Sequence, residues 1–163
     1  MTIEQVDLLT ELEFVRNFGG IYEHSPWVAE RAWQWRPFGT LENLISQMQS
    51  EVNAASHAEQ LALVRAHPDL GTRARVSEAS ASEQSSVGLD RLTAEEYDRI
   101  LRLNDQYKDK FAFPFIFAVK GSDKHAILAA LERRLKSTPE DEFSEALSQI
   151  HRISRFRLEE KIK

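Results

Sequence analysis

The sequence predicts an all-α protein, and three observations carry that prediction. Apolar residues recur at helical spacing in most segments, as Leu44, Ile45 and Met48 do. The motif Ser/Thr-x-x-Glu, whose two side chains cap the start of a helix, occurs several times, for example at Thr10 and Ser56. No segment shows an alternation of apolar and polar residues that would be convincing for a strand.

Four helices are predicted in the first part of the chain, each from a start signal. The predicted starts are the Thr10-x-x-Glu13 capping box, Ser25 before Pro26, Thr40, and the Ser56-x-x-Glu59 capping box. Gly19 and Gly20 should end the first helix, and Pro37 follows the second. Pro68 disfavours the helical conformation at His67, so the fourth helix should end about there.

The remainder of the chain is predicted to be mostly helical after one polar interruption. Residues 71–86 are predicted to be mainly loop, with Ser80 capping a helical turn that contains Glu83 and Gln84. Three further helices should start at the Thr93-x-x-Glu96 capping box, at Asp123 and at Thr138-Pro139. The expected architecture is a bundle of about seven to nine helices. With no linker and no repeat, residues 1–163 should form a single domain.

Composition excludes several classes of function. The chain has 163 residues, of which 42% are hydrophobic and 29% charged, as is usual for a soluble globular protein. It contains no cysteine, so disulfides, thiolate metal sites and cysteine nucleophiles are excluded. The net charge of -5 argues against nucleic acid as a partner. No apolar run approaches the roughly 20 residues that a membrane span needs, so no membrane association is expected.

The cytoplasm is the expected location. The first residues carry Glu4, Asp7 and Glu11 instead of a basic, apolar leader, and residues 160–163 are not a peroxisomal signal. A metal site is not expected. The only pair of potential metal ligands that stands out, Asp123-x-His125, is too weak a motif to indicate one. There is no glycine-rich phosphate loop either.

His67 is the strongest single candidate for chemistry. Imidazole is the one side chain that titrates near neutral pH without perturbation, so it can both donate and accept a proton during turnover. The predicted helix end and Pro68 would hold it on a rigid turn, aimed into a cleft. The alternative is that His67 only caps the preceding carbonyl groups while Pro68 and Asp69 make a turn.

A second candidate is the group Ser80, Glu83 and Gln84. These residues place a hydroxyl, a carboxylate and an amide within five positions of a stretch too polar for core. The amide offers a donor and an acceptor at once, which suits a ureido or cyclic amide substrate. Taken alone, Ser80-x-x-Glu83 also has the form of an ordinary capping box, and that reading stays open.

The most apolar stretch, residues 111–117, is more typical of core than of a cofactor site. Its length and Pro114 favour an extended segment. Buried extended backbone has donors and acceptors that no helix satisfies, and a heterocycle with amide groups could pair with them.

Arg157 continues the apolar stripe of the last predicted helix, three residues beyond Ser154. An arginine in such a place usually extends its head group to the rim of the protein. The alternative is that its planar guanidinium binds a ligand carboxylate or carbonyl.

Several motifs, in the same order and at similar spacing, resemble the OHCU decarboxylases, which act on 2-oxo-4-hydroxy-4-carboxy-5-ureidoimidazoline (OHCU) at the end of urate breakdown. The matching segments are Glu23–Val28, Arg36–Phe38, Arg65–Gly71, Ser80-x-x-Glu83-Gln84, Gly88-Leu89, Lys110–Ile116 and Ile153-x-x-x-Arg157-Leu158. One departure is Ala112, where the family usually has glycine.

This resemblance implies an all-helical bundle, usually a homodimer, with no metal or organic cofactor. It places the catalytic histidine at His67 and the essential carboxylate at Glu83. It implies substrate-binding roles for Pro68, Ser80, Gln84, Arg157 and the backbone of Phe115, Ile116, Phe117, Ala118 and Val119. The implied reaction yields (S)-allantoin and carbon dioxide. Two other hypotheses stay open: a helical interaction module, and a related enzyme that acts on another ureido compound.

Overall fold

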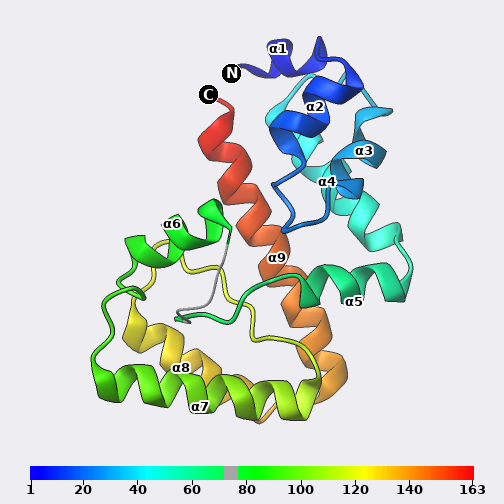
Figure 1. Ribbon diagram of the computed structural model, residues 1–163. Helices are drawn as coiled ribbons and strands as arrows, with labels where there is room; N and C mark the ends of the chain where they lie inside the picture. Colours follow the sequence, from blue (N-terminus) through cyan, green and yellow to red (C-terminus); the bar gives the residue numbers. More distant parts are fainter. Residues whose placement is uncertain (72–76) are drawn as a thin grey trace. The chain divides into compact units, whose positions relative to one another are not determined.

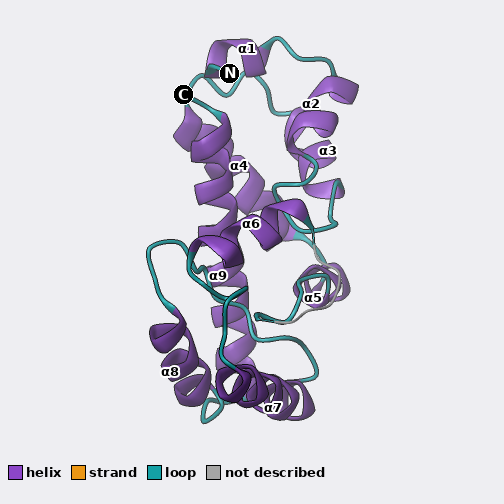
Figure 2. Cartoon of the chain, turned by 60° about the vertical axis from the view of Figure 1, so that its left-hand side comes forward, coloured by secondary structure: helices purple, strands orange, loops and turns teal. Residues whose placement is uncertain are grey.

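The computed structural model describes residues 1–71 and 77–163, and these residues form helices joined by loops (Figure 1). Within these two ranges there is no strand, which confirms the all-α prediction (Figure 2). The helices are α1 (Ile3–Asp7), α2 (Glu11–Phe18), α3 (Trp27–Trp33), α4 (Leu41–Ala54), α5 (His57–Arg65), α6 (Glu78–Ser86), α7 (Ala94–Phe111), α8 (Lys124–Arg134) and α9 (Pro139–Lys161).

Most of the predicted helix starts are confirmed. Capping boxes open α2 at Thr10, α5 at Ser56 and α7 at Thr93. The side chains of Thr40 and Asp123 accept a backbone N–H in the first turn of α4 and α8. These caps satisfy N–H groups that have no partner within the helix, which is why they can be predicted from sequence.

The prediction that Ser25 caps a helix is wrong. Helix α3 begins at Trp27, its N-cap residue is Pro26, and no side-chain hydrogen bond caps it. The Ser25 hydroxyl instead donates to the carbonyl oxygen of Glu23 at 2.9 Å. A serine hydroxyl can bond to backbone groups on either side of it in the chain, and the sequence does not decide which it takes.

The prediction for residues 71–86 is wrong in part. Residues 78–86 form helix α6 instead of a loop, and its N-cap is Ser77, whose hydroxyl accepts the N–H of Ser80 at 3.1 Å. Ser80 therefore lies inside the helix and does not cap it. The region offers several serines as candidate caps and has no apolar stripe to fix the start. The rest of the predicted loop, residues 72–76, lies outside the described residues.

Helix α1 was not predicted from the sequence. It is only five residues long, so it cannot show helical periodicity, although Thr2 and Gln5 form a capping box at its start. The signal that could have revealed it is this pair of side chains, because glutamine can replace glutamate in the motif.

The chain divides into two compact units. The first contains residues 1–66 and 151–163, and the second contains residues 67–150. In the first unit, α3 packs against both α2 and α4. The ring of Phe14 lies 5.0 Å from that of Phe18 and 5.8 Å from that of Phe38, measured between centroids. Apolar burial of this kind is the main stabilising contribution in such a unit.

In the second unit, α7 packs against α8, and an aromatic cluster forms its core. The Tyr107 ring lies within 6.0 Å of the rings of Phe111, Phe113 and Phe115, measured between centroids. Residues 114–119 have no helical or strand assignment and run as the predicted non-helical segment. The chain enters it through Ala112, whose φ of 62° lies in the left-handed region.

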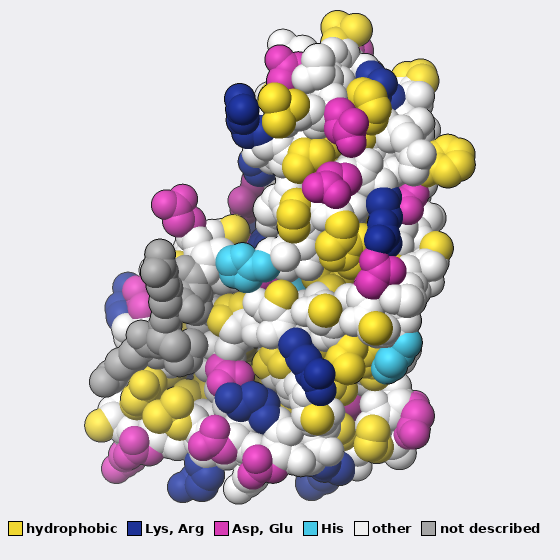
Figure 3. Space-filling model, turned by 45° about the vertical axis from the view of Figure 1, so that its right-hand side comes forward, with side chains coloured by type: hydrophobic (Ala, Val, Ile, Leu, Met, Phe, Trp, Pro, Cys, Tyr) yellow, Lys and Arg dark blue, Asp and Glu magenta, His cyan; other side chains and the backbone are white. Residues whose placement is uncertain are grey.

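The face in Figure 3 carries acidic and basic side chains mixed together, without a large field of one sign. Among the described residues, no helix is both long and apolar enough to cross a membrane.

Candidate functional site

The residues around His67 form a turn that we call the histidine turn (residues 67–71). His67 comes directly after Ala66, the C-cap of α5, and its side chain is buried, with 8% exposed. Gly71 closes the turn with a φ of +72°. A Cβ atom at this position would lie 2.9 Å from Cδ1 of Ile100, so both the backbone conformation and the space require glycine.

Two amide side chains bind the backbone of the histidine turn. Asn104, from α7, donates its Nδ2 to the carbonyl oxygen of Leu70 at 3.0 Å. Gln84, from α6, accepts the N–H of Gly71 at its Oε1, also at 3.0 Å. The turn that carries His67 is therefore hydrogen-bonded to two different helices.

An ion pair adds a third contact to this turn. Nζ of Lys108, from α7, lies 2.7 Å from Oδ2 of Asp69. The hydrogen bond to Asp69 is the largest cause of the raised pKa of Lys108. The pair is partly exposed, so we attribute to it a geometric role more than a large contribution to stability.

One face of α6 carries the predicted polar group. Ser80, Glu83 and Gln84 occupy positions i, i+3 and i+4, which lie on the same side of a helix. Ser80 and Gln84 are buried and Glu83 is half-buried. The structure thus rejects the capping box at Ser80-x-x-Glu83, and it gives the three side chains a common face.

Two buried amide atoms beside the histidine turn have no hydrogen-bond partner among the described residues. They are Nε2 of Gln84, a donor, and Oδ1 of Asn104, an acceptor. Leaving such an atom unpaired costs roughly 1–3 kcal/mol, so each calls for a reason in a native protein. A ligand with both N–H and carbonyl groups would satisfy both atoms.

Asn104 was missed as a site residue in the sequence. It lies on the buried face of α7, four residues after Ile100 and three before Tyr107, and only 2% of it is exposed. The sequence does contain an indication of this role. Asn104 occupies a position at which the helical spacing predicts a buried, apolar side chain, and a polar residue there is unusual.

The predicted backbone segment 115–119 belongs to the same unit. Phe115, Ile116, Ala118 and Val119 are buried, and Phe117 is half-buried. Helix α7 contacts both parts of the site, because Asn104 bonds to the histidine turn while the ring of Tyr107 lies 5.5 Å from that of Phe115. Pro68 is half-buried beside His67.

Arg157 belongs to the first unit, and its guanidinium is not at the rim. Nη2 lies 2.9 Å from Oε2 of Glu23, and Nη1 donates to the carbonyl oxygen of Ile21 at 3.2 Å. The side chains of Arg157 and Glu23 are 8% and 1% exposed. A buried guanidinium held by a carboxylate and a backbone carbonyl is oriented, which a rim arginine would not be.

The described residues of the second unit thus supply a buried imidazole, a half-buried carboxylate and two amide side chains, each with one atom that has no partner among them. This set can move a proton and bind a molecule rich in amide groups. No group of three or more potential metal ligands occurs within the described ranges.

Known proteins resemble this chain over nearly its whole length. The sequence model of the family described as OHCU decarboxylase matches residues 7–159. The 2-oxo-4-hydroxy-4-carboxy-5-ureidoimidazoline decarboxylase of Haloferax volcanii is 47% identical over 161 residues, which cover 99% of this chain and 96% of that protein. A uric acid degradation bifunctional protein of Bacillus subtilis is 44% identical over 96% of this chain, which covers 32% of that longer protein.

Two solved structures share the fold. The crystal structure of (S)-allantoin synthase aligns with a TM-score of 0.83 and 36% identity, covering all of this chain and 54% of that one. The chain therefore spans about half the length of that protein. A crystal structure of OHCU decarboxylase determined in the presence of (S)-allantoin aligns with a TM-score of 0.73 and 24% identity, over 87% of this chain and 94% of that one.

Proposed function

This chain belongs to the OHCU decarboxylase family, and from that membership we propose how its residues carry out the family's reaction. It is a carboxy-lyase that decarboxylates 2-oxo-4-hydroxy-4-carboxy-5-ureidoimidazoline in urate degradation. The observation that carries this conclusion is the 47% identity to the Haloferax volcanii enzyme over nearly the whole length of both chains.

The chemistry divides into two steps. The bond between the ring carbon and the carboxylate breaks, carbon dioxide leaves, and the electron pair stays on the ring carbon, delocalised toward the neighbouring imine. A proton is then added to one face of the former imine carbon, which carries the ureido group, while the hydroxyl on the carbon that lost carbon dioxide gives up its proton and becomes a carbonyl; the product is (S)-allantoin. The protein must therefore stabilise developing negative charge and control where the proton arrives.

His67 is the residue that handles the proton in this proposal. Its support is the geometry of the histidine turn: the imidazole is buried, and the backbone beside it is bonded to Gln84 and Asn104. A fixed imidazole can deliver a proton to one face of a planar intermediate. A mobile one would give racemic product.

Glu83 is the second catalytic residue in this proposal, and it orients either His67 or the hydroxyl group of the substrate. Its position one turn after Ser80, on the face of α6 that also carries Gln84, supports this role. Glu83 is half-buried, so its carboxylate is partly removed from water while staying reachable.

Substrate binding is assigned to further polar groups of the chain. Nε2 of Gln84 is a buried donor suited to a carbonyl or carboxylate of the substrate. Ser80 lies on the same face of α6 as Gln84, and Pro68 follows His67 in the histidine turn. The backbone of residues 115–119 offers further N–H and carbonyl groups. Arg157 binds the substrate carboxylate, a role for which its orientation by Glu23 prepares it.

We further propose that the protein is a cytoplasmic homodimer, needs no metal or organic cofactor, and folds as one domain. The resemblance described above supports the dimer and the absence of a cofactor. The single family match over residues 7–159 spans both units, which supports one domain. Light scattering of the purified protein should give a mass of twice the monomer, and a monomeric mass would contradict the dimer.

The proposed reaction is tested by giving the purified protein freshly generated OHCU and following circular dichroism. The enzyme should speed the appearance of the signal of (S)-allantoin. Formation of racemic allantoin at the uncatalysed rate would contradict it. A second arm with other ureido compounds tests the alternative of a related enzyme.

A further inference from the structure

Three side chains on one face of α7 meet three consecutive residues of the histidine turn. They are four positions apart in the helix, and they belong to Ile100, Asn104 and Lys108. Ile100 lies against Gly71, where an added Cβ atom would be 2.9 Å from its Cδ1. Asn104 bonds to the carbonyl oxygen of Leu70, one residue back. Lys108 pairs with Asp69, one residue further back. Successive turns of α7 therefore fix successive residues of the turn.

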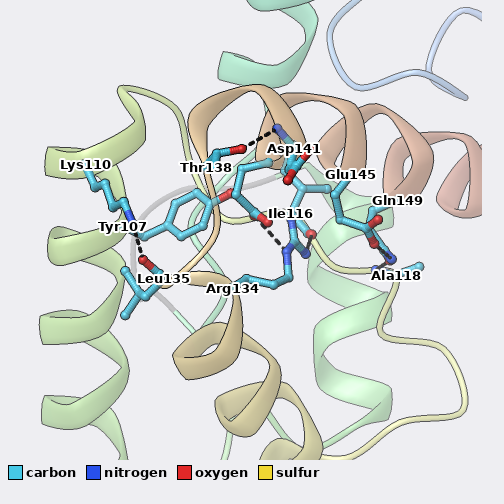
Figure 4. A network of polar contacts seen from close by, with 11 residues as sticks. Tyr107, Lys110, Ile116, Ala118, Arg134, Leu135, Thr138, Asp141, Glu145 and Gln149 are labelled. Carbon is cyan, nitrogen blue, oxygen red and sulfur yellow. Dashed lines mark hydrogen bonds and ion pairs between the residues drawn. The ribbon is translucent and has the colours of Figure 1, made fainter.

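Helix α7 is itself anchored by a buried polar network in the same unit (Figure 4). The hydroxyl of Tyr107, three residues after Asn104, donates to Oε1 of Glu142 in α9. Nε of Arg134, at the end of α8, lies 2.8 Å from the same oxygen. All three side chains of this network are at most 5% exposed. The face of α7 that meets the histidine turn is thus part of a helix with a fixed position in the unit.

The bond of Asn104 falls on a peptide group that Gln84 also binds. Nδ2 of Asn104 donates to the carbonyl oxygen of Leu70 at 3.0 Å. Oε1 of Gln84 accepts the N–H of Gly71 at the same distance. That carbonyl and that N–H belong to one trans peptide bond, in which they point in opposite directions. The two amide side chains therefore hold one peptide group from its two edges, from α7 and from α6.

These bonds decide which atom of each amide is left over. Gln84 uses its oxygen and keeps Nε2, whereas Asn104 uses its nitrogen and keeps Oδ1. Both remaining atoms are buried and have no partner within the described ranges. Asn104 is only 2% exposed, and an unpaired acceptor at that depth costs stability. Stability alone therefore does not explain why an asparagine stands there.

We propose that Asn104 is a positioning residue for the reaction, which fixes the histidine turn through the Leu70–Gly71 peptide group and thereby fixes the imidazole of His67. Leu70 is three positions after His67. Pro68 lies between them, and its ring restricts φ, so the chain has little freedom to absorb a displacement of the peptide group. The inference rests on the proposed function, because it takes His67 as the residue that handles the proton.

The test begins with Asn104→Asp, which replaces the amide nitrogen by an oxygen. When the new carboxyl group is protonated, its O–H can donate to Leu70 and its other oxygen stays an acceptor, as in the amide. When it is ionised, it has no donor and repels the carbonyl oxygen of Leu70. Burial raises the pKa of a carboxyl group from its ordinary value of about 4, so a change of pH moves the variant between the two forms.

The expected result is a pH-dependent rescue of kcat. The kcat of Asn104→Asp should approach the wild-type value at low pH and fall below it by about 10²-fold as the pH rises, because a small displacement of a catalytic group has an effect of that size. Taking the ratio to the wild type at each pH removes the titrations that both proteins share, including those of His67, Asp69 and Lys108. A purely structural role would lower the melting temperature and leave kcat of the folded variant unchanged.

Two further variants complete the test. Asn104→Leu has no donor at any pH, so its kcat should be low throughout. Asn43→Asp is the matched control, because Nδ2 of Asn43 also donates to a backbone carbonyl, that of Phe38, from an exposed side chain. Its ratio to the wild type should stay near one at every pH. Far-UV circular dichroism at each pH restricts the comparison to folded protein.

The outcomes separate the two proposals. If the wild-type protein did not turn over OHCU, the proposed function itself would fail. Should the wild type be active while folded Asn104→Leu keeps the wild-type kcat, only the positioning role is overturned. Equal losses for Asn104→Asp and Asn104→Leu at every pH also overturn it, because the donor would then not matter.

Two remaining outcomes are decided in the same way. A ratio near one for Asn104→Asp at every pH, beside an impaired Asn104→Leu, supports the positioning role, because the carboxyl group then stays protonated and keeps its donor. If Asn104→Leu does not fold, the profile of Asn104→Asp decides alone. A ratio that does not rise as the pH falls would then overturn the inference.

Discussion

Glu23 and Arg157 form a buried ion pair, although 134 positions separate them in the sequence. The two atoms that meet, Oε2 of Glu23 and Nη2 of Arg157, are 2.9 Å apart. Because Nη1 of Arg157 is also bonded to the carbonyl oxygen of Ile21, the plane of the guanidinium is fixed. An arginine oriented in this way is prepared to receive a carboxylate without losing further rotamer freedom.

Arg157→Lys should weaken substrate binding while keeping the positive charge. Lysine cannot reproduce the planar fork, so the binding free energy should fall by roughly 1–3 kcal/mol, measured as a rise in KM. Arg155→Lys on the same helix is the matched control, because Arg155 pairs with exposed Glu42 and should leave KM unchanged. Equal KM values for the wild type and Arg157→Lys would show that Arg157 does not bind the substrate.

Glu83→Gln should separate catalysis from stability. Glu83 lies in the middle of α6 and not in a capping box, so glutamine should be tolerated there with almost no change in urea unfolding. Turnover of OHCU should nevertheless collapse, because the amide carries no charge and does not accept a proton. Near-normal turnover by this variant would show that the carboxylate is not essential.

Ala112→Gly should stabilise the protein. Ala112 has a φ of 62°, and an L-residue in this conformation costs about 1 kcal/mol that glycine avoids. The free energy of unfolding should therefore rise by about that amount. Ala129→Gly, within α8 and exposed, should lower it by about 1 kcal/mol instead. Urea unfolding of both variants checks the sign, and a loss at both positions would contradict the account of Ala112.

Chelation should leave the enzyme fully active. Many decarboxylases rely on a cofactor as an electron sink, but OHCU carries its own sink in the imine beside the carboxylate. We expect unchanged turnover after exhaustive dialysis against EDTA, and no absorbance beyond the aromatic band in the purified protein. A loss of activity that a divalent metal ion restores would contradict this mechanism.

The parts of the fold that sequence could predict are those set by residues close together in the chain. The capping boxes at Thr10, Ser56 and Thr93 each involve side chains three positions apart, and all three were found. Ser77 and Ser80 are equally good caps by type, so the start of α6 was misplaced. Nothing local distinguishes them, because α6 has no apolar stripe.

The site was predicted less completely, for a related reason. His67 and Gln84 could be proposed from their residue types, but the hydrogen bond between Asn104 and Leu70 spans 34 positions and has no local signature. The contact of Arg134 with Ile116 is likewise a product of how α8 packs against the extended segment. Such contacts depend on the tertiary fold, which no spacing rule encodes.

In the proposed mechanism, His67 delivers the proton that makes the product chiral. His67→Asn keeps one hydrogen-bonding group of the ring but cannot exchange a proton, and the fold should be retained, as far-UV circular dichroism and the melting temperature would show. The most direct measurement is the rate at which this variant forms (S)-allantoin from freshly generated OHCU, followed by circular dichroism of the product. We expect a loss on the order of 10²-fold or more relative to the wild type. Formation of (S)-allantoin by the folded variant at near wild-type rate would contradict it.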